Sequence, residues 1–302
     1  MADHDVDPLR ETAPAKVNLF LHIEGRRADG MHELESLVAF CDIGDALVVA
    51  PADRITLSVD GPFAASVSAG SDNLVLQAAQ ALRGLTGVGL GARIALTKNL
   101  PVAAGIGGGS ADAAAALRAL CRLWKQTPEP DALLRLAVSL GADVPVCLSG
   151  VPQLVRGIGE QIRVFENLPN ASLVLVNPGV PVATADVFRR YDRLAMRQTV
   201  GRQRTEPMSW ASRQDVDGLL AALVNRQNDL QDCACVAVPE IAAVLAELDA
   251  TADCRLARMS GSGATCYGLF GGDEQARVAA AEIARKRPDW WVRATTLRIG
   301  AG

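Results

Sequence analysis

Histidine and surplus positive charge are both scarce in this sequence. Its 302 residues include three histidines, at positions 4, 22 and 32, which are too few for a His-rich metal centre, and we expect no metal held by side chains alone. Lysine and arginine number 30 against 34 acidic residues, so the net charge is −4. A protein without a basic surface cannot neutralise a phosphate backbone, and nucleic acid is therefore not an expected partner.

Long hydrophobic runs are also absent. No stretch approaches the ~18 apolar residues of a membrane-spanning helix, and residues 1–8 are acidic and lack the apolar segment of a signal peptide. Apolar residues nevertheless make up 49% of the chain and charged residues 21%, a balance typical of globular proteins. We therefore expect a cytoplasmic protein that does not associate with membranes.

Cysteine occurs seven times, and an odd number argues against a disulfide framework. The only close pair is Cys233 and Cys235, and no other metal ligands stand near it in the sequence. A metal site needs more ligands, so we expect buried thiols in an apolar stretch instead.

Lysine is rare even among the basic residues. Only four of the thirty are lysine, at positions 16, 98, 125 and 286, so arginine is the usual choice in this chain. The two side chains differ in shape and hydration, and a lysine indicates a place where a compact ammonium is required. The inference is weak alone but useful for Lys16 and Lys98, which stand near other motifs.

The order of predicted elements favours the α+β class. Residues 15–23 alternate in the manner of a strand, whereas apolar residues recur at helical spacing over 113–124. Helices and strands then mix without the strict alternation of a parallel sheet. A polar segment at 167–170 resembles a linker, and we divide the chain there into domains 1–166 and 167–302.

Three local predictions are made near the motifs discussed next. Ser110 is predicted to be the N-cap of a helix that contains residues 113–124. A short strand is expected at 144–148. Residues 197–216 are polar and rich in Arg, Gln and Ser, so they are expected to form an exposed loop.

A glycine-rich loop, residues 105–110, stands between a predicted strand and this helix. Glycines let the backbone turn sharply and approach an anion, and the free amides of the first helical turn then point at it. The sequence lacks the Gly-Lys-Ser/Thr of a Walker loop, and Ser110 stands where the dinucleotide fingerprint needs glycine. A di- or triphosphate fits such a loop, although a tight turn without a ligand remains the alternative.

A second cluster, residues 260–263 with the sequence Ser-Gly-Ser-Gly, has the composition of another backbone nest. By itself, such a cluster is more often a turn than a ligand site.

Three segments together resemble the GHMP superfamily, the kinases of galactose, homoserine, mevalonate and phosphomevalonate. These segments are PAKVNLFL at 14–21, LPVAAGIGGGSADAA at 100–114 and MSGSGATCYG at 259–268. Further segments, RADGMH at 27–32, Gly44-Asp45 and GADVP at 141–145, resemble the branch whose substrate is a methylerythritol carrying a cytidine diphosphate. The likeness covers essentially the whole chain, and the combination is highly specific where no single segment is.

The resemblance implies a two-domain GHMP kinase fold. The N-terminal domain would be ribosomal-protein-S5-like, would bind ATP and would contain an uncommon left-handed βαβ unit. The C-terminal domain would be ferredoxin-like, and the active site would lie in the cleft between the two. The implied reaction is ATP-dependent phosphorylation of the 2-hydroxyl of the cytidine-linked methylerythritol, in the non-mevalonate route to isoprenoid precursors.

Two residues are the candidate catalytic pair. Asp143 stands where the chain turns in GADVP, and the resemblance implies that its carboxylate accepts the proton of the attacking hydroxyl. From the residues alone, a turn or helix-capping aspartate is the more common role. The resemblance also implies that the Lys16 ammonium stabilises negative charge beside it.

The resemblance assigns the substrate's cytidine to a second group of residues, Asn18, His32, Thr184 and Phe188. His32 would bond to the cytosine and Phe188 would stack on it, although Phe188 also has the spacing of a core helix residue. The family usually has tyrosine where this chain has Met31, which lacks both a π-face and a hydroxyl.

For ATP, the resemblance places Asn73 and Lys98 near the adenosine. The loop residues Gly105, Gly107, Gly108, Gly109 and Ser110 would bind the β- and γ-phosphates. Gly261 and Gly263 would complete the cleft. Mg²⁺ is expected as a second cofactor, held mainly by phosphates and water because no cage of carboxylates is visible.

Two other functions remain open at this point. Another kinase of the superfamily is the first, and Asp143 argues against homoserine kinase, which typically lacks that base, but not against mevalonate kinase. The second is a nucleotide-binding protein without catalysis, which Lys16, Asp143 and the intact loop disfavour. The expected partners are ATP and a small cytidine diphosphate substrate, and the expected assembly is a monomer or weak homodimer.

Overall fold

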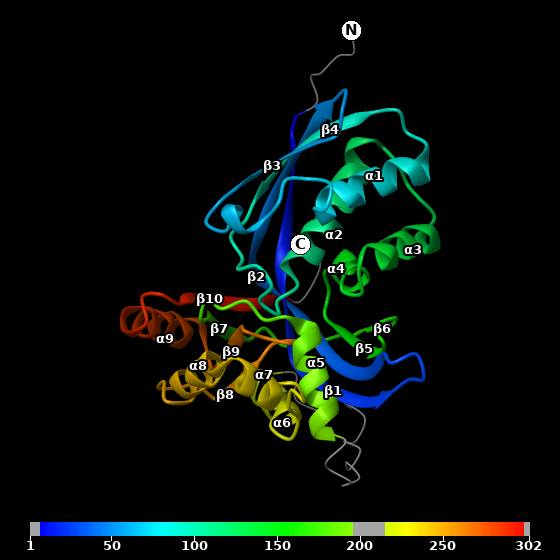
Figure 1. Cartoon of the computed structure of the whole chain (residues 1–302). Helices are drawn as coiled ribbons and strands as arrows, with labels where there is room; N and C mark the ends of the chain where they lie inside the picture. Colours follow the sequence, from blue (N-terminus) through cyan, green and yellow to red (C-terminus); the bar gives the residue numbers. More distant parts are fainter. Residues whose placement is uncertain (1–6, 196–214, 299–302) are drawn as a thin grey trace. The chain divides into compact units, whose positions relative to one another are not determined.

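The computed structural model describes residues 7–195 and 215–298, which fall into two compact units (Figure 1). Unit 1 comprises the chain up to Lys16, Ile43–Val102 and Gly107–Gly150, and unit 2 comprises the rest. Two long paired strands, β1 (Leu9–Arg26) and β2 (His32–Ala52), contribute residues to both units. The units therefore do not follow chain order, and the linear division into domains 1–166 and 167–302 stays a prediction.

Unit 1 contains a βαβ crossover next to β2. Strand β3 (Thr56–Asp60) pairs in parallel with β4 (Gly91–Thr97), and α1 (Leu74–Thr86) connects them. Antiparallel strands need only a short turn, but a parallel pair requires such a crossover. Strand β4 in turn pairs antiparallel with the second half of β2, from Ala46 opposite Thr97 to Ala52 opposite Gly91.

Helices α1, α2 (Gly108–Leu123), α3 (Pro130–Leu140) and α4 (Val144–Ser149) group beside β3 and β4, and a single 3₁₀ turn, η1 (Ala64–Ser66), lies in the connection to α1 (Figure 1). Helix α2 is the centre of this group, because it packs on α1, α3 and α4. Alanines at 111 and 113–116 are almost wholly buried, and their small side chains let the neighbouring helices approach closely. The packing fixes the position of the first turn of α2, which contains residues 108–110 of the glycine loop.

Unit 2 contains an antiparallel sheet in the order β10–β7–β9–β8. These strands are β7 (Ser172–Asn177), β8 (Leu256–Met259), β9 (Cys266–Phe270) and β10 (Trp291–Arg298). Numbered along the chain, the order is fourth, first, third, second, which is the split βαβ arrangement of a ferredoxin-like domain.

Helices of unit 2 pack on this sheet and on one another. Helices α8 (Pro239–Asp249) and α9 (Asp273–Lys286) lie against the sheet, while α5 (Thr184–Ala195) packs on α7 (Gln231–Ala237). The shared core includes Val174, Ile241, Phe270 and Ile283, all fully buried. The remaining elements are α6 (Val216–Leu223), β5 (Gln153–Gly157) and β6 (Gln161–Val164), and β5 pairs with the first half of β2.

Two local predictions were wrong. The segment 144–148 is helix α4 and not a strand, since Pro145 suits the first turn of a helix and the chain turns at Asp143 just before it. Helix α2 begins at Gly108, with Gly107 as its N-cap, so Ser110 lies inside the first turn. The loop predicted at 197–216 lies almost entirely outside the described residues. No helix in the described ranges has both the length and the apolarity to cross a membrane.

A substitution at Gly44 tests whether β1 and β2 approach each other closely at this residue. A Cβ at this position would lie 2.3 Å from the carbonyl oxygen of Ala13, so the strand must move to accept it. Gly44→Ala should lower the free energy of unfolding by about 1–3 kcal/mol, measured by urea denaturation.

Gly84 supplies the matched control, because it lies inside α1 with open space around its Cα. Gly84→Ala should raise the free energy of unfolding by about 0.5–1 kcal/mol, the usual gain of alanine over glycine in a helix. Equal effects of the two substitutions would contradict the strand packing described here.

Candidate active site

Gly107 turns the chain into α2 through a left-handed conformation, with φ of +65°. A Cβ at this position would lie 2.5 Å from Cγ of Lys16, so a larger residue would collide with the lysine side chain. No described side chain caps this end of α2, which leaves the amides of the first turn without a side-chain acceptor. Such amides and the positive end of the helix dipole suit an anion, and the role of this loop toward phosphates stays a prediction.

Lys16 and Asp143 meet beside this turn. The Lys16 ammonium lies 3.1 Å from Oδ2 of Asp143, with side-chain exposures of 7% and 46% respectively. Asp143 directly precedes α4, yet its carboxylate does not cap the helix. The structure thus brings together Lys16, Asp143 and Gly107, and a half-exposed carboxylate beside a buried ammonium is free to receive a proton from a bound hydroxyl.

Lys98 is held in a buried cluster of charges. Its ammonium donates to Oδ2 of Asp45 at 2.5 Å and to Oδ2 of Asp112 at 2.7 Å. Asp45 also accepts from the backbone N–H groups of Asn99 and Leu100, at 2.5 and 2.9 Å. Because Asp112 belongs to the first turns of α2, the cluster ties the strand β4 side of the loop to the helix side.

The cluster carries two carboxylates and one ammonium away from water. Burial raises the pKa of Asp112 well above its usual value, and the Lys98 charge only partly opposes this rise. Burial alone would lower the pKa of Lys98, but the two carboxylates raise it, so the ammonium stays charged. Oδ1 of Asp112 is buried with no hydrogen-bond partner among the described residues, which fits a carboxyl group with an elevated pKa.

Asn73, the other residue predicted near the adenosine, is the N-cap of α1. Its Oδ1 accepts from the N–H of Val75 at 2.9 Å, and its Nδ2 donates to the carbonyl of Ser68 at 2.6 Å. Both bonds fix the start of a helix. The predicted roles of Asn73 and Lys98 toward ATP stay predictions.

In unit 2, Asn18 is buried and bonded through both its backbone and its side chain. Its N–H donates to Oγ of Ser260 at 3.1 Å, and its Nδ2 donates to Oγ of Ser36 at 2.7 Å. Oγ of Ser260 donates to the carbonyl of Gly105 at 3.0 Å. A Cβ at Gly105 would lie 2.5 Å from the Ser260 carbonyl oxygen, so the second glycine cluster packs directly on the first part of the loop.

His32 and Phe188, both predicted to bind cytosine, lie side by side. Their ring centroids are 4.8 Å apart, and the planes are tilted by 32°. Nε2 of His32 lies 2.6 Å from Oδ1 of Asp192, a residue that the sequence analysis did not identify. Thr184, the fourth predicted substrate residue, exchanges a hydrogen bond of 2.7 Å with Ser262 in the second glycine cluster.

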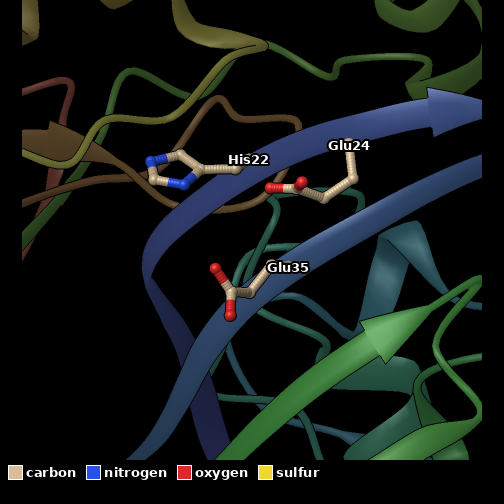
Figure 2. Close-up of side chains that lie close together, drawn as sticks. All are labelled: His22, Glu24 and Glu35. Atoms are coloured by element: carbon tan, nitrogen blue, oxygen red, sulfur yellow. The ribbon is translucent and has the colours of Figure 1, made fainter. Parts of the chain in front are cut away.

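A further group of titratable side chains lies on β1 and β2. Figure 2 shows His22 and Glu24 on one strand and Glu35 on its neighbour. The potential ligand atoms of the three side chains all lie within 4.8 Å of one another. Glu35 already pairs with Arg156, and Arg226 lies 3.8 Å away, so two guanidinium groups balance its charge. Nε2 of His22 accepts from the N–H of Gln227, and burial lowers the pKa of this histidine. We interpret the group as part of an ion-pair network and not as a metal centre.

Comparison with known proteins identifies the family. The model "GHMP kinases N terminal domain" matches residues 73–151, and "GHMP kinases C terminal" matches residues 210–289. The 4-diphosphocytidyl-2-C-methyl-D-erythritol kinase of Paramagnetospirillum magneticum is 51% identical over 93% of this chain and 95% of its own. The enzyme of the same name from Parvibaculum lavamentivorans is 47% identical, over 94% of this chain and 97% of its own. The chain belongs to this kinase family.

A solved structure agrees with the family. The crystal structure of a 4-(cytidine 5'-diphospho)-2C-methyl-D-erythritol kinase aligns with a TM-score of 0.78 and 36% identity, over 97% of this chain and all of that one (100%). The predicted α+β fold with GHMP N- and C-terminal domains is therefore confirmed. The ferredoxin-like strand order in unit 2 belongs to the same fold.

The buried cluster predicts how stability depends on pH in this member of the kinase family. Since the pKa of Asp112 is raised in the folded state, that state holds its proton more tightly than the unfolded chain does. This tighter proton binding stabilises the folded state fully below the ordinary aspartate pKa of about 3.9. The stabilisation declines as the pH rises through the raised pKa that Asp112 has in the folded state. In Asp112→Asn, the free energy of unfolding should therefore fall less steeply with rising pH, as measured by denaturation at a series of pH values. A slope equal to that of the wild type would contradict the elevated pKa.

Proposed function

We infer that this chain is a kinase that uses ATP to phosphorylate the 2-hydroxyl of 4-diphosphocytidyl-2-C-methyl-D-erythritol. The products are the 2-phosphate and ADP, and the reaction belongs to the non-mevalonate route to isoprenoid precursors. The observation that supports it best is the Lys16–Asp143 pair beside the uncapped first turn of α2. It supports the proposal because a half-exposed carboxylate, an ammonium and uncapped helix amides all belong to unit 1.

Asp143 is proposed as the general base. The 2-hydroxyl oxygen attacks the γ-phosphorus of ATP, its proton passes to the Asp143 carboxylate, and the bond from that phosphorus to the β–γ bridging oxygen breaks. ADP leaves with the bonding electrons. The half-exposed position of Asp143 suits this role, since a substrate hydroxyl must reach the carboxylate.

Lys16 is proposed to stabilise the negative charge that develops during transfer. Its ammonium is buried, where a charge acts more strongly than in water. Its aliphatic chain passes close over Gly107, so the ammonium and the loop amides act on one region.

The ATP site is proposed to include Asn73, Lys98 and the loop residues. Gly105, Gly107, Gly108, Gly109 and Ser110 offer backbone amides to the β- and γ-phosphates. Mg²⁺ fits a site of this kind, because uncapped amides receive phosphate oxygens that themselves supply the ligands the ion prefers. When bound, it would neutralise charge on the phosphates.

Residues of unit 2 are proposed to hold the cytidine portion. His32 bonds to the base and Phe188 stacks on it, which their adjacent rings support. Asn18 and Thr184 contribute polar contacts. Asn18 stands two residues after Lys16 on β1, so catalytic and substrate-binding residues are linked through one strand. A cytoplasmic location and a monomeric or weakly dimeric state complete the proposal.

Acceptor specificity tests the proposal directly. With ATP and Mg²⁺, the wild-type protein should release one ADP per phosphorylated cytidine substrate, and mevalonate and homoserine should give turnover lower by at least ~10²-fold. Calorimetry should also detect binding of free CMP, because base recognition is independent of the reacting hydroxyl. Efficient phosphorylation of mevalonate without CMP binding would reject the proposed substrate and favour another kinase of the superfamily.

A further inference from the structure

The His32 ring is held by three side chains from one stretch of α5. Asp192 approaches Nε2 at 2.6 Å, and Phe188 lies against the ring at 4.8 Å. Tyr191 meets it edge-on, with centroids 6.1 Å apart and an interplanar angle of 82°. Phe188 and Asp192 are four residues apart, so they share a face of the helix. The ring therefore has a fixed position and a fixed orientation.

Asp192 is also held from the opposite side. Its second oxygen, Oδ2, lies 3.4 Å from a guanidinium nitrogen of Arg26. Nε of Arg26 donates at 3.2 Å to the carbonyl of Gly30, in the turn that leads to His32. The carboxylate is thus directed at the histidine through one oxygen and pairs with Arg26 through the other.

A carboxylate that accepts a hydrogen bond from imidazole requires a proton on the bonded nitrogen. A neutral ring then carries that proton on Nε2 and a lone pair on Nδ1. Nδ1 has no hydrogen-bond partner among the residues that the structure describes. It therefore remains available as an acceptor for a ligand.

We propose that Asp192 is a positioning residue that holds His32 as the Nε2–H tautomer, so that Nδ1 selects a pyrimidine with an exocyclic amine. Cytosine presents an amino group at its 4-position, which donates to Nδ1, whereas uracil presents a carbonyl oxygen there. Two facing acceptors repel each other, and a buried acceptor left unpaired weakens binding. The inference rests on the proposed function, because it assumes that His32 faces the base.

Tyr191 also supports the proposed tautomer of His32, through an aromatic contact with the ring. The family that this chain resembles usually has a tyrosine beside the histidine, and this chain has Met31 there, with 49% of its surface exposed. Helix α5 supplies Tyr191 at the ring instead. An edge-on aromatic contact stabilises one ring orientation, and so limits the rotation that would exchange Nδ1 and Nε2.

The tautomer can be measured directly by nuclear magnetic resonance of ¹⁵N-labelled imidazoles. The chain has only three histidines, and the signals that disappear in His32→Ala are those of His32. In the wild-type protein, His32 should show a protonated Nε2 and an unprotonated Nδ1. A ring protonated at Nδ1 alone, or at both nitrogens, would overturn the proposal without any variant of Asp192.

Kinetics then test the effect on specificity. The wild type should prefer the cytidine substrate over its uridine counterpart, and Asp192→Ala should reduce that preference by about tenfold while the KM for ATP is unchanged. Asp192→Asn should retain part of the preference, because an amide oxygen still accepts from Nε2–H. If Asp192→Ala proves unfolded, Asp192→Asn and the wild-type spectrum decide the question.

Asp186 provides the control on the same helix. It is exposed and pairs with Arg189, away from the histidine, so Asp186→Ala should leave the preference unchanged. An unaltered preference in Asp192→Ala, or an equal loss in both variants, would overturn the role of Asp192. Wild-type turnover of the cytidine substrate separately tests the proposed function. A failure of that function is therefore distinguishable from a failure of the role proposed for Asp192.

Discussion

The missing side chain at Gly107 is the constraint on which the candidate catalytic centre depends. Lys16 passes so close to this residue that a Cβ would lie 2.5 Å from its Cγ, and the ammonium then reaches Asp143 at 3.1 Å. The same residue has φ of +65°, which opens the first turn of α2. One glycine therefore sets both the path of the lysine and the direction of the loop amides.

The buried charges beneath the loop serve the same geometry. A Cβ at Gly108 would lie 3.4 Å from the Lys98 ammonium, so the cluster of Lys98, Asp45 and Asp112 stands directly against the start of α2. Burying three charges is costly unless each is well paired, and removal of one partner leaves an uncompensated charge. We interpret the cluster as a rigid support that keeps the loop in one conformation.

Much of this arrangement is predictable from the sequence, for reasons that differ between residues. Lys16 and Asp143 are identified by short motifs, and the rarity of lysine supports Lys16 and Lys98 independently. The alternation over 15–23 lies inside β1, and the helical spacing over 113–124 lies in α2 and its C-cap, because such elements carry their own apolar pattern. The strand predicted at 144–148 was wrong because a short apolar run has no periodicity that distinguishes a helix from a strand.

Partners distant in sequence cannot be found in this way. Asp192 is 160 positions from His32, and Asp45 is 53 from Lys98, so only the folded chain shows which carboxylate meets which base. The polar role of Ser36 is hidden for the same reason, because its partners Asn18 and Phe20 lie 18 and 16 positions away. Local motifs indicate the candidate catalytic residues, whereas the residues that hold them in place emerge only from tertiary structure.

The central claim is that Lys16 and Asp143 work as one unit, and a double-mutant cycle tests it most directly. Single-turnover rates of phosphoryl transfer would be measured for Lys16→Met, Asp143→Asn and the combined variant. Each single change should lower the rate by at least ~10²-fold, and the combination should be no slower than the worse single variant. Losses that multiply in the combined variant, or near-normal turnover in Asp143→Asn, would contradict the account.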